Sequence, residues 1–164
     1  MKKLEDGIVL YHGSYCIVEK PDLEKCALYK DFGCGFYLSD NYTQALNMAK
    51  TKVEQLEVGV PIVMEFEVAD SVFQTFRVLQ FKEYTKEWAQ FILQNRNNST
   101  QQQVHDYDIV IGPIANDRVG VQLWRYNSHS IDLDTLVKNL RYMHGITIQY
   151  FFGTERAIQQ LKRI

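Results

Sequence analysis

Short runs of apolar, β-branched and aromatic residues alternate along this chain with longer segments of helical periodicity. Runs of the first kind are typical of strands, and segments of the second kind are typical of amphipathic helices. Strands are predicted at residues 8–11, 36–39, 62–69, 71–81, 107–115 and 147–152, and helices at residues 42–58, 82–97, 130–143 and 154–164. Because the two kinds do not follow a regular βαβ spacing, an α+β fold is favoured over a doubly wound parallel sheet.

Two of the predicted helices follow side chains that can cap a helix N-terminus. Asp40 or Asn41 precedes the helix at 42–58, and Thr154 precedes the last helix. Apolar residues at helical spacing predict that the helix at 42–58 buries one face. The residues of that face are Ala45, Leu46, Met48, Ala49, Val53 and Leu56.

Size and charge limit the classes of protein that fit. The 164 residues are about the length of one ordinary domain, so a single domain over residues 1–164 is predicted. The net charge of −2 predicts no strong attraction to phosphate backbones or anionic membranes. The chain has no run of about 18 apolar residues, and its charged beginning lacks the apolar core of a signal peptide. A cytoplasmic protein with no membrane partner is therefore expected.

The cysteines and histidines show no pattern of a disulfide framework or a metal site. The three cysteines are odd in number and include no Cys-x-x-Cys pair, so a reducing compartment fits best. They are Cys16, Cys26 and Cys34. His105, His129 and His144 have no partners at metal-ligand spacing, so no metal is expected.

Two short motifs in the first forty residues carry the strongest functional signal. The first predicted strand leads into Tyr11-His12-Gly13-Ser14, and the second strand lies within Gly33-Cys34-Gly35-Phe36-Tyr37-Leu38-Ser39-Asp40. In this order and spacing, they resemble the nucleotide pocket of ADP-ribosyltransferases of the diphtheria-toxin and poly-ADP-ribose-polymerase type. The resemblance implies an ADP-ribosyltransferase-like split antiparallel sheet with flanking helices.

The resemblance also implies that NAD is the substrate and gives the motif residues their roles. Gly13 would bond the nicotinamide carboxamide through its N–H and C=O, and His12 would donate to a ribose hydroxyl. Tyr37 would offer a flat face to the nicotinamide ring, with Gly33 and Gly35 turning the preceding loop tightly against it. The residues expected to bind NAD are His12, Gly13, Ser14, Gly33, Gly35, Phe36, Tyr37 and Met48.

The third catalytic position of these enzymes is usually a Glu, and here it matches Gln149. The expected catalytic set is therefore His12, Tyr37 and Gln149. Gln can still accept a hydrogen bond from a ribose hydroxyl, but it carries no charge. Losing that charge costs about 1–2 kcal/mol, or roughly tenfold in rate, which slows the reaction without abolishing it. In the polymerases a Ser and a second Tyr stand where this chain has Ala45 and Met48.

The whole chain is also similar to an uncharacterised bacterial family, DUF3990. This similarity rests on the YHGS and KDFGCGFYLS motifs and on two later stretches. The later stretches are YDIVIGPIANDRVG and IQYFFGTERAIQQL.

Two further segments have both a structural and a functional interpretation. Asn116, Asp117 and Arg118 follow a predicted strand, either as a turn in which Asp117 pairs with Arg118 or as a rim that contacts phosphate or an acceptor. Glu155 is either a first-turn helix residue or an acidic group that substitutes for the missing Glu.

Together these features predict mono-ADP-ribosyl transfer to a protein or nucleic-acid acceptor, or NAD glycohydrolysis. Two alternatives remain open. One is a catalytically inactive module that binds NAD or ADP-ribose. The other is an interaction protein with a cognate partner, such as one half of a toxin and antitoxin pair.

Overall fold

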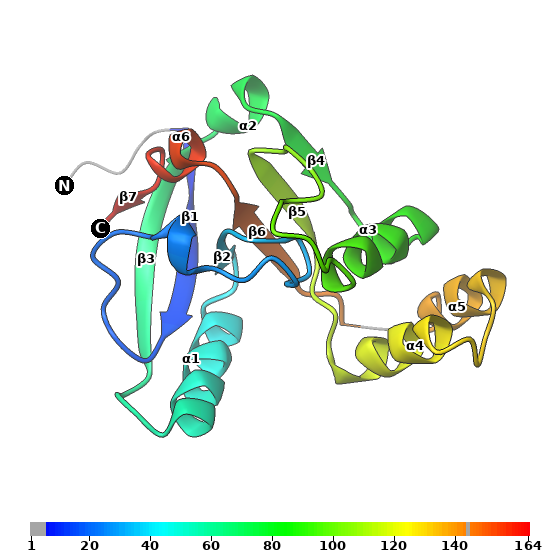
Figure 1. Cartoon of the computed structure of the whole chain (residues 1–164). Coiled ribbons are helices and arrows are strands. Elements are labelled where there is room, and N and C mark those ends of the chain that lie inside the picture. Colours follow the sequence, from blue (N-terminus) through cyan, green and yellow to red (C-terminus); the bar gives the residue numbers. More distant parts are fainter. Residues whose placement is uncertain (1–5, 144) are drawn as a thin grey trace.

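A single sheet organises the molecule (Figure 1). The computed structural model describes residues 6–143 and 145–164, and within them the sheet has seven strands in the order β4-β5-β6-β2-β1-β3-β7. The strands are β1 (Gly7–Ser14), β2 (Phe36–Ser39), β3 (Ile62–Ala69), β4 (Val78–Gln80), β5 (Ile109–Pro113), β6 (Ile148–Phe152) and β7 (Lys162–Arg163). One sheet with helices interspersed along the chain confirms the predicted mixed α+β class.

Six helices and one 3₁₀ turn are present in the same described residues. They are α1 (Tyr42–Leu56), α2 (Val72–Thr75), α3 (Lys86–Arg96), α4 (Asp117–Asn127), α5 (Leu133–Leu140), α6 (Glu155–Ile158) and the 3₁₀ turn η1 (Leu23–Lys25). Asn41 caps α1 by accepting a hydrogen bond from the backbone N–H of Gln44, and Thr154 caps α6 in the same way, so both predicted caps are confirmed. Helix α1 packs on β1, whereas α3, α4 and α5 pack on one another toward the β4–β5 edge of the sheet (Figure 1).

The strand pairing differs from the expected antiparallel sheet at one edge. Strands β4 and β5 run parallel, and every other neighbouring pair is antiparallel. The reason is the connection between them, because α3 lies in the crossover and returns the chain to the same end of the sheet. Strands β1 and β2 share a single registered pair, Tyr11 with Ser39, so the two halves of the sheet are joined only narrowly.

A hydrophobic core lies on each face of the sheet. The alternation of side chains along a strand assigns neighbours to opposite cores, so that Phe152 packs with Leu10 and Phe66 on one face while Phe151 packs with Phe32 on the other. The second core includes the fully buried Trp88 of α3, as well as residues of α4 and α5. The three helices on that side are therefore held by the same face of the sheet that carries Phe151.

Several predicted elements differ from those observed. The stretch 71–81, predicted to be extended, forms α2 and then β4, and the helix predicted at 154–164 is only α6, followed by the exposed strand β7. Helix α4 was not predicted. A turn was expected after Asn116, but the Asn116 side chain accepts a hydrogen bond from the backbone N–H of Val119 and caps a helix. Within the described residues, Asp117 and Arg118 form no ion pair. On α1, Met48 and Leu56 are exposed although the periodicity predicted them to be buried.

The structure also corrects the expectation that the cysteines stay unpaired. Cys26 and Cys34 form a disulfide with their Cα atoms 5.0 Å apart, and Cys16 is free and exposed. The disulfide closes the residues between them into a loop. The spacing of the cysteines did not predict this disulfide. Within the described part of the chain, no helix is long and apolar enough to cross a membrane.

Asp108, just before β5, ties that strand to the C-terminal segment and to β4. Its buried carboxylate accepts hydrogen bonds from the Thr154 hydroxyl at 2.7 Å, from Arg156 Nε at 2.9 Å and from the backbone N–H of Arg77 at 3.0 Å. The hydrogen bonds from Arg156 hold the pKa of Asp108 well below its usual range. Nearby, Asp106 pairs with the Arg77 side chain at the surface, where both partners are exposed.

These two carboxylates provide a matched test of what stabilises the fold. Asp108→Asn removes a buried charge that several donors share, and we expect it to lower the free energy of unfolding by about 2–3 kcal/mol. Asp106→Asn removes an exposed partner, and its effect should stay below about 1 kcal/mol. Urea denaturation of both variants at neutral pH measures the difference, and equal effects would contradict the role assigned to Asp108.

Candidate functional site

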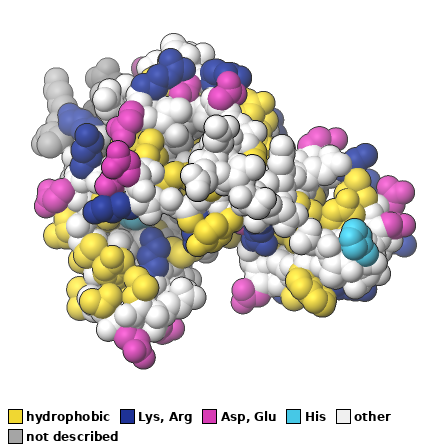
Figure 2. Space-filling model, viewed as in Figure 1, with side chains coloured by type: hydrophobic (Ala, Val, Ile, Leu, Met, Phe, Trp, Pro, Cys, Tyr) yellow, Lys and Arg dark blue, Asp and Glu magenta, His cyan; other side chains and the backbone are white. Residues whose placement is uncertain are grey.

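A cavity of about 510 Å³ opens where β1 and β2 separate. Its floor is made by these two strands and by Gln149 of β6, and one wall is α1. The other walls are the loop that contains Lys25 to Asp31 and the segment Ile114-Ala115 after β5. The space-filling view is hollowed between the part that carries α1 and the part that carries α4 and α5 (Figure 2). A cavity of this size is typical of a small-molecule site.

His12 occupies the place where the sheet separates. If the register from Tyr11 and Ser39 continued, Gly13 would face Tyr37, but the ladder between β1 and β2 stops before this pair. Instead, the His12 ring donates a hydrogen bond from Nδ1 to the Tyr37 carbonyl at 2.6 Å and stacks on Phe36 with ring centroids 4.1 Å apart. The first strand was predicted to end at residue 11, but β1 continues to Ser14, so His12 lies within the strand and is largely buried.

The bond to Tyr37 also decides what His12 can offer a ligand. A carbonyl oxygen only accepts, so Nδ1 carries the proton. Burial, assisted by the nearby charge of Lys52, lowers the pKa of His12 from 6.5 to about 4, and the ring is neutral at pH 7. Because the neutral ring carries its proton on Nδ1, Nε2 is an acceptor, and it makes no hydrogen bond within the described residues. The expectation that His12 donates to a ribose hydroxyl is thus corrected, because the neutral ring would accept a hydrogen bond from it.

The Tyr37 hydroxyl holds the loop before β2. It donates to the Gly33 carbonyl at 2.7 Å and accepts from the backbone N–H of Phe32 at 3.0 Å. Burial raises the pKa of this phenol far above its ordinary value, so it stays protonated. The hydroxyl is fully engaged by the loop, which leaves the Tyr37 ring as the part that can contact a ligand.

Side chains distant in sequence hold the same loop from outside. Gln103 accepts from the backbone N–H of Cys34 at 3.0 Å and donates to its carbonyl at 2.9 Å, so its amide acts like a strand neighbour. Arg96 of α3 bonds Asp31 at 2.6 Å, and His105 donates to a loop carbonyl at 2.7 Å. The loop over residues 31–34, of which Asp31 lines the cavity, is therefore held in place by side chains from the second half of the chain.

The glycines of the motifs are explained by close packing. A Cβ on Gly13 would lie 1.9 Å from the Ala45 carbonyl, so glycine lets α1 rest directly on β1. A Cβ on Gly35 would lie 2.2 Å from the Phe151 ring. Gly33 has a φ of +92°, which glycine adopts readily, and its backbone lies outside the cavity lining.

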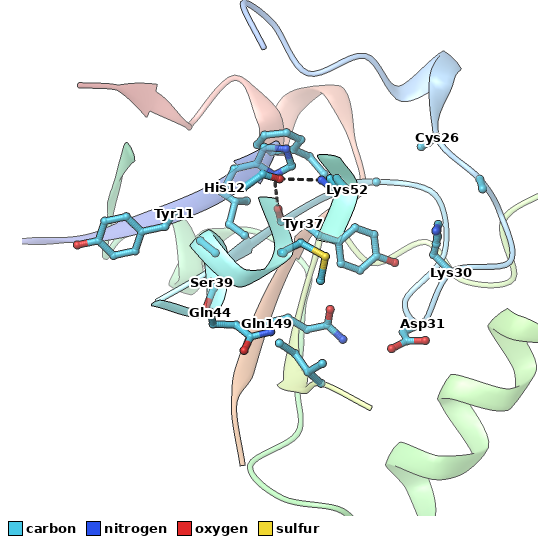
Figure 3. A pocket seen from close by; sticks show the side chains of 18 of the residues that line it. Tyr11, His12, Cys26, Lys30, Asp31, Tyr37, Ser39, Gln44, Lys52 and Gln149 are labelled. Atoms are coloured by element: carbon cyan, nitrogen blue, oxygen red, sulfur yellow. Dashed lines mark hydrogen bonds between the residues drawn. The ribbon is translucent and has the colours of Figure 1, made fainter. Parts of the chain in front are cut away.

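Gln149 places an unpartnered amide in the floor of the cavity. It lies between Ser39 of β2 and Gly112 of β5, and its side chain is nine-tenths buried. Its Nε2 has no hydrogen-bond partner within the described residues. An unpaired buried polar group costs about 1–3 kcal/mol, so this amide is suited to a polar ligand. Figure 3 shows it in the cavity with Tyr37.

Lys52 is a site residue that the sequence interpretation missed. Its Nζ donates to the Gly13 carbonyl at 2.7 Å (Figure 3). Burial and then the charge of Lys30 lower its pKa below the ordinary value. Lys52 lies four residues after Met48 on the same face of α1, so helical periodicity could have located it.

A comparison with protein families identifies the family of the chain. The model of a protein family described as a protein of unknown function (DUF3990) matches residues 8–163. This chain belongs to the DUF3990 family. The match confirms the predicted membership and covers all of the cavity lining. Neither a curated protein nor a solved structure matches the chain.

In this DUF3990 protein, most but not all of the predicted site residues share the cavity. The predicted residues that line it are His12, Gly13, Gly35, Phe36, Tyr37, Met48 and Gln149. The predicted residues outside its lining are Ser14, Gly33, Asn116, Asp117, Arg118 and Glu155. Asn116 caps α4, and Glu155 lies in the first turn of α6. Among the described residues, no three His, Cys, Asp or Glu side chains are placed to share a metal ion, and His144 lies outside these residues.

The lowered pKa of His12 predicts a pH-dependent stability. The unfolded chain takes up a proton near pH 6.5, whereas folded His12 does so only near pH 4. The contribution of His12 to the free energy of unfolding is therefore constant above pH 6.5 and decreases as the pH falls from 6.5 to 4. Between pH 7 and pH 5 the decrease is about 2 kcal/mol.

His12→Asn keeps an N–H donor, does not titrate, and should lack this component. His129 is exposed with a φ of +63°, which Asn tolerates, so His129→Asn is the matched control and should behave as the parent. Urea denaturation at the two pH values measures the effect. Parallel pH dependence in the parent and in His12→Asn would contradict the assignment.

Proposed function

We propose that this DUF3990 protein is an ADP-ribosyltransferase-like protein that binds NAD in the cavity between β1 and β2. The observation that carries the proposal is the unpartnered Gln149 amide, which lies in one cavity with the Tyr37 ring and the acceptor nitrogen of His12. A nicotinamide riboside has a flat ring to stack on Tyr37 and hydroxyls that can bond His12 and Gln149.

The proposed reaction breaks the bond between the nicotinamide nitrogen and ribose C1′. Nicotinamide leaves with the bonding electrons as a neutral molecule, and the sugar becomes an oxocarbenium-like cation. Water or an acceptor hydroxyl, amine or carboxylate then bonds C1′, and a nucleophile that carries a proton releases it. Gln149 would accept a hydrogen bond from the ribose 2′-hydroxyl through its amide oxygen, and its unpartnered Nε2 would donate one to an oxygen of the ligand. The products are nicotinamide and either ADP-ribose or a mono-ADP-ribosylated acceptor.

A second candidate, a module that binds NAD or ADP-ribose without turnover, is favoured by the charge of the site. Gln149 supplies no negative charge to stabilise the sugar cation, and Lys52 places a positive charge at the same cavity. Lys52 also uses one lone pair of the Gly13 carbonyl, which leaves one lone pair for a carboxamide. These features lower the expected rate of bond cleavage while leaving the binding groups in place.

Substitution of Gln149 separates the two candidates. Gln149→Glu adds the missing charge and should raise the rate of nicotinamide release from NAD about tenfold or more. Gln149→Ala should weaken NAD binding by removing the amide. Gln55 is exposed on α1 outside the cavity, so Gln55→Glu adds the same charge elsewhere and should leave both quantities unchanged.

Calorimetric titration with NAD and ADP-ribose, together with chromatographic detection of nicotinamide, measures both effects. Binding without nicotinamide release in the parent and in Gln149→Glu identifies the non-catalytic module. Absence of NAD and ADP-ribose binding, or binding that is unchanged in both Gln149→Ala and Tyr37→Ala, rejects the pocket assignment altogether.

A further inference from the structure

We infer that Lys52 and Lys30 form a diphosphate subsite, which selects ligands by their phosphate groups and not by their base or sugar. The inference rests on the proposed function for the identity of the ligand, and it adds the residues that would hold the ligand's phosphates. No residue expected from the sequence motifs contributes a charge to this subsite.

The position of Lys52 is the first observation. It lies half-buried on α1, and its ammonium donates to a neutral acceptor, the Gly13 carbonyl. Within the described residues, no carboxylate forms an ion pair with it. The charged or titratable groups that act on it are Lys30 and the thiol of Cys16. An ammonium has three donors, so two remain for a ligand. A partly buried cation that forms no ion pair is suited to bind an anionic ligand.

The other charges of the lining are the second observation. Lys25, Lys30 and Lys52 line the cavity with one carboxylate, that of Asp31. Arg96 of α3 already neutralises Asp31, and both side chains of this pair are mostly buried. Lys25 pairs with Asp22 at 3.9 Å, so the local excess of positive charge comes from Lys30 and Lys52, although the whole chain has a net charge of −2. A cavity with cations on its walls raises the local concentration of anions.

The positions of the two lysines and the volume of the cavity favour a small anionic ligand that carries a diphosphate. Lys52 approaches from α1 and Lys30 from the loop closed by Cys26 and Cys34 (Figure 3). Two ammonium groups on different walls match a bridge of two phosphates, each with one negative charge, better than a single carboxylate. The aromatic ring of Tyr37 and the volume of about 510 Å³ leave room for an attached base or sugar.

The ligand class is therefore that of dinucleotides and nucleoside diphosphate esters, such as NAD and ADP-ribose. Nucleosides without phosphate lack the groups that Lys52 and Lys30 would bond. The affinity should also fall as the ionic strength rises, because both contacts are between charges.

Substitutions that keep the length of the lysine chain but remove its charge test the subsite. Lys52→Met should weaken the binding of ADP-ribose and of inorganic pyrophosphate about tenfold or more, and Lys30→Met should weaken it by a smaller factor because Lys30 is exposed. Lys50 lies on α1, is exposed and is outside the cavity lining, so Lys50→Met is the matched control. Nicotinamide riboside should bind far more weakly than NAD and should lose no affinity in any of the three variants.

Calorimetric titration at low and high salt measures these affinities, with circular dichroism as the test of folding. If Lys52→Met does not fold, the exposed Lys30→Met decides the question. Pyrophosphate binding that depends on Lys52 without any NAD binding would support the subsite and reject the proposed function. NAD binding that is equal in the parent, Lys52→Met and Lys30→Met would overturn the subsite and leave the proposed function standing.

Discussion

The hydrogen bond from the His12 ring to the Tyr37 carbonyl is the interaction on which the site depends. It forms where the backbone ladder between β1 and β2 ends, and it gives the Tyr37 carbonyl a partner that Gly13 would otherwise have supplied. A continuous ladder would close the floor, since neighbouring strands lie only about 4.8 Å apart. The side-chain hydrogen bond keeps the two halves of the sheet together and leaves the gap where the cavity opens.

The groups around this gap divide into a neutral floor and charged walls. His12, Tyr37 and Gln149 are uncharged at neutral pH, whereas Lys52 and Lys30 bring positive charge from α1 and from the loop. A positive wall holds a negatively charged ligand but opposes the growth of positive charge on a sugar. If the proposed ligand binds here, the charge that favours its phosphates would also retard cleavage of its glycosidic bond.

Elements with strong local patterns were predictable from the sequence, as was the convergence of His12, Tyr37 and Gln149 on one cavity. The capped helix at 42–58 and the apolar strands needed only short-range signals. Helix α4 was missed because Val121 and Trp124 are exposed, which obscures the apolar stripe of an amphipathic helix. The clamp of Gln103 on Cys34 spans 69 residues, and the pairing of β7 with β3 joins distant segments. Contacts of this kind have no local signature.

The unpaired amide of Gln149 also links occupancy of the cavity to the lifetime of the chain. A ligand that bonds this amide binds the folded form and not the unfolded one, so it shifts the folding equilibrium by mass action. The empty protein carries the full cost of the unmet polar group and opens more often to proteases. If the proposed ligand bonds this amide, the abundance of the protein in a cell would rise with the concentration of that ligand, even where no reaction takes place.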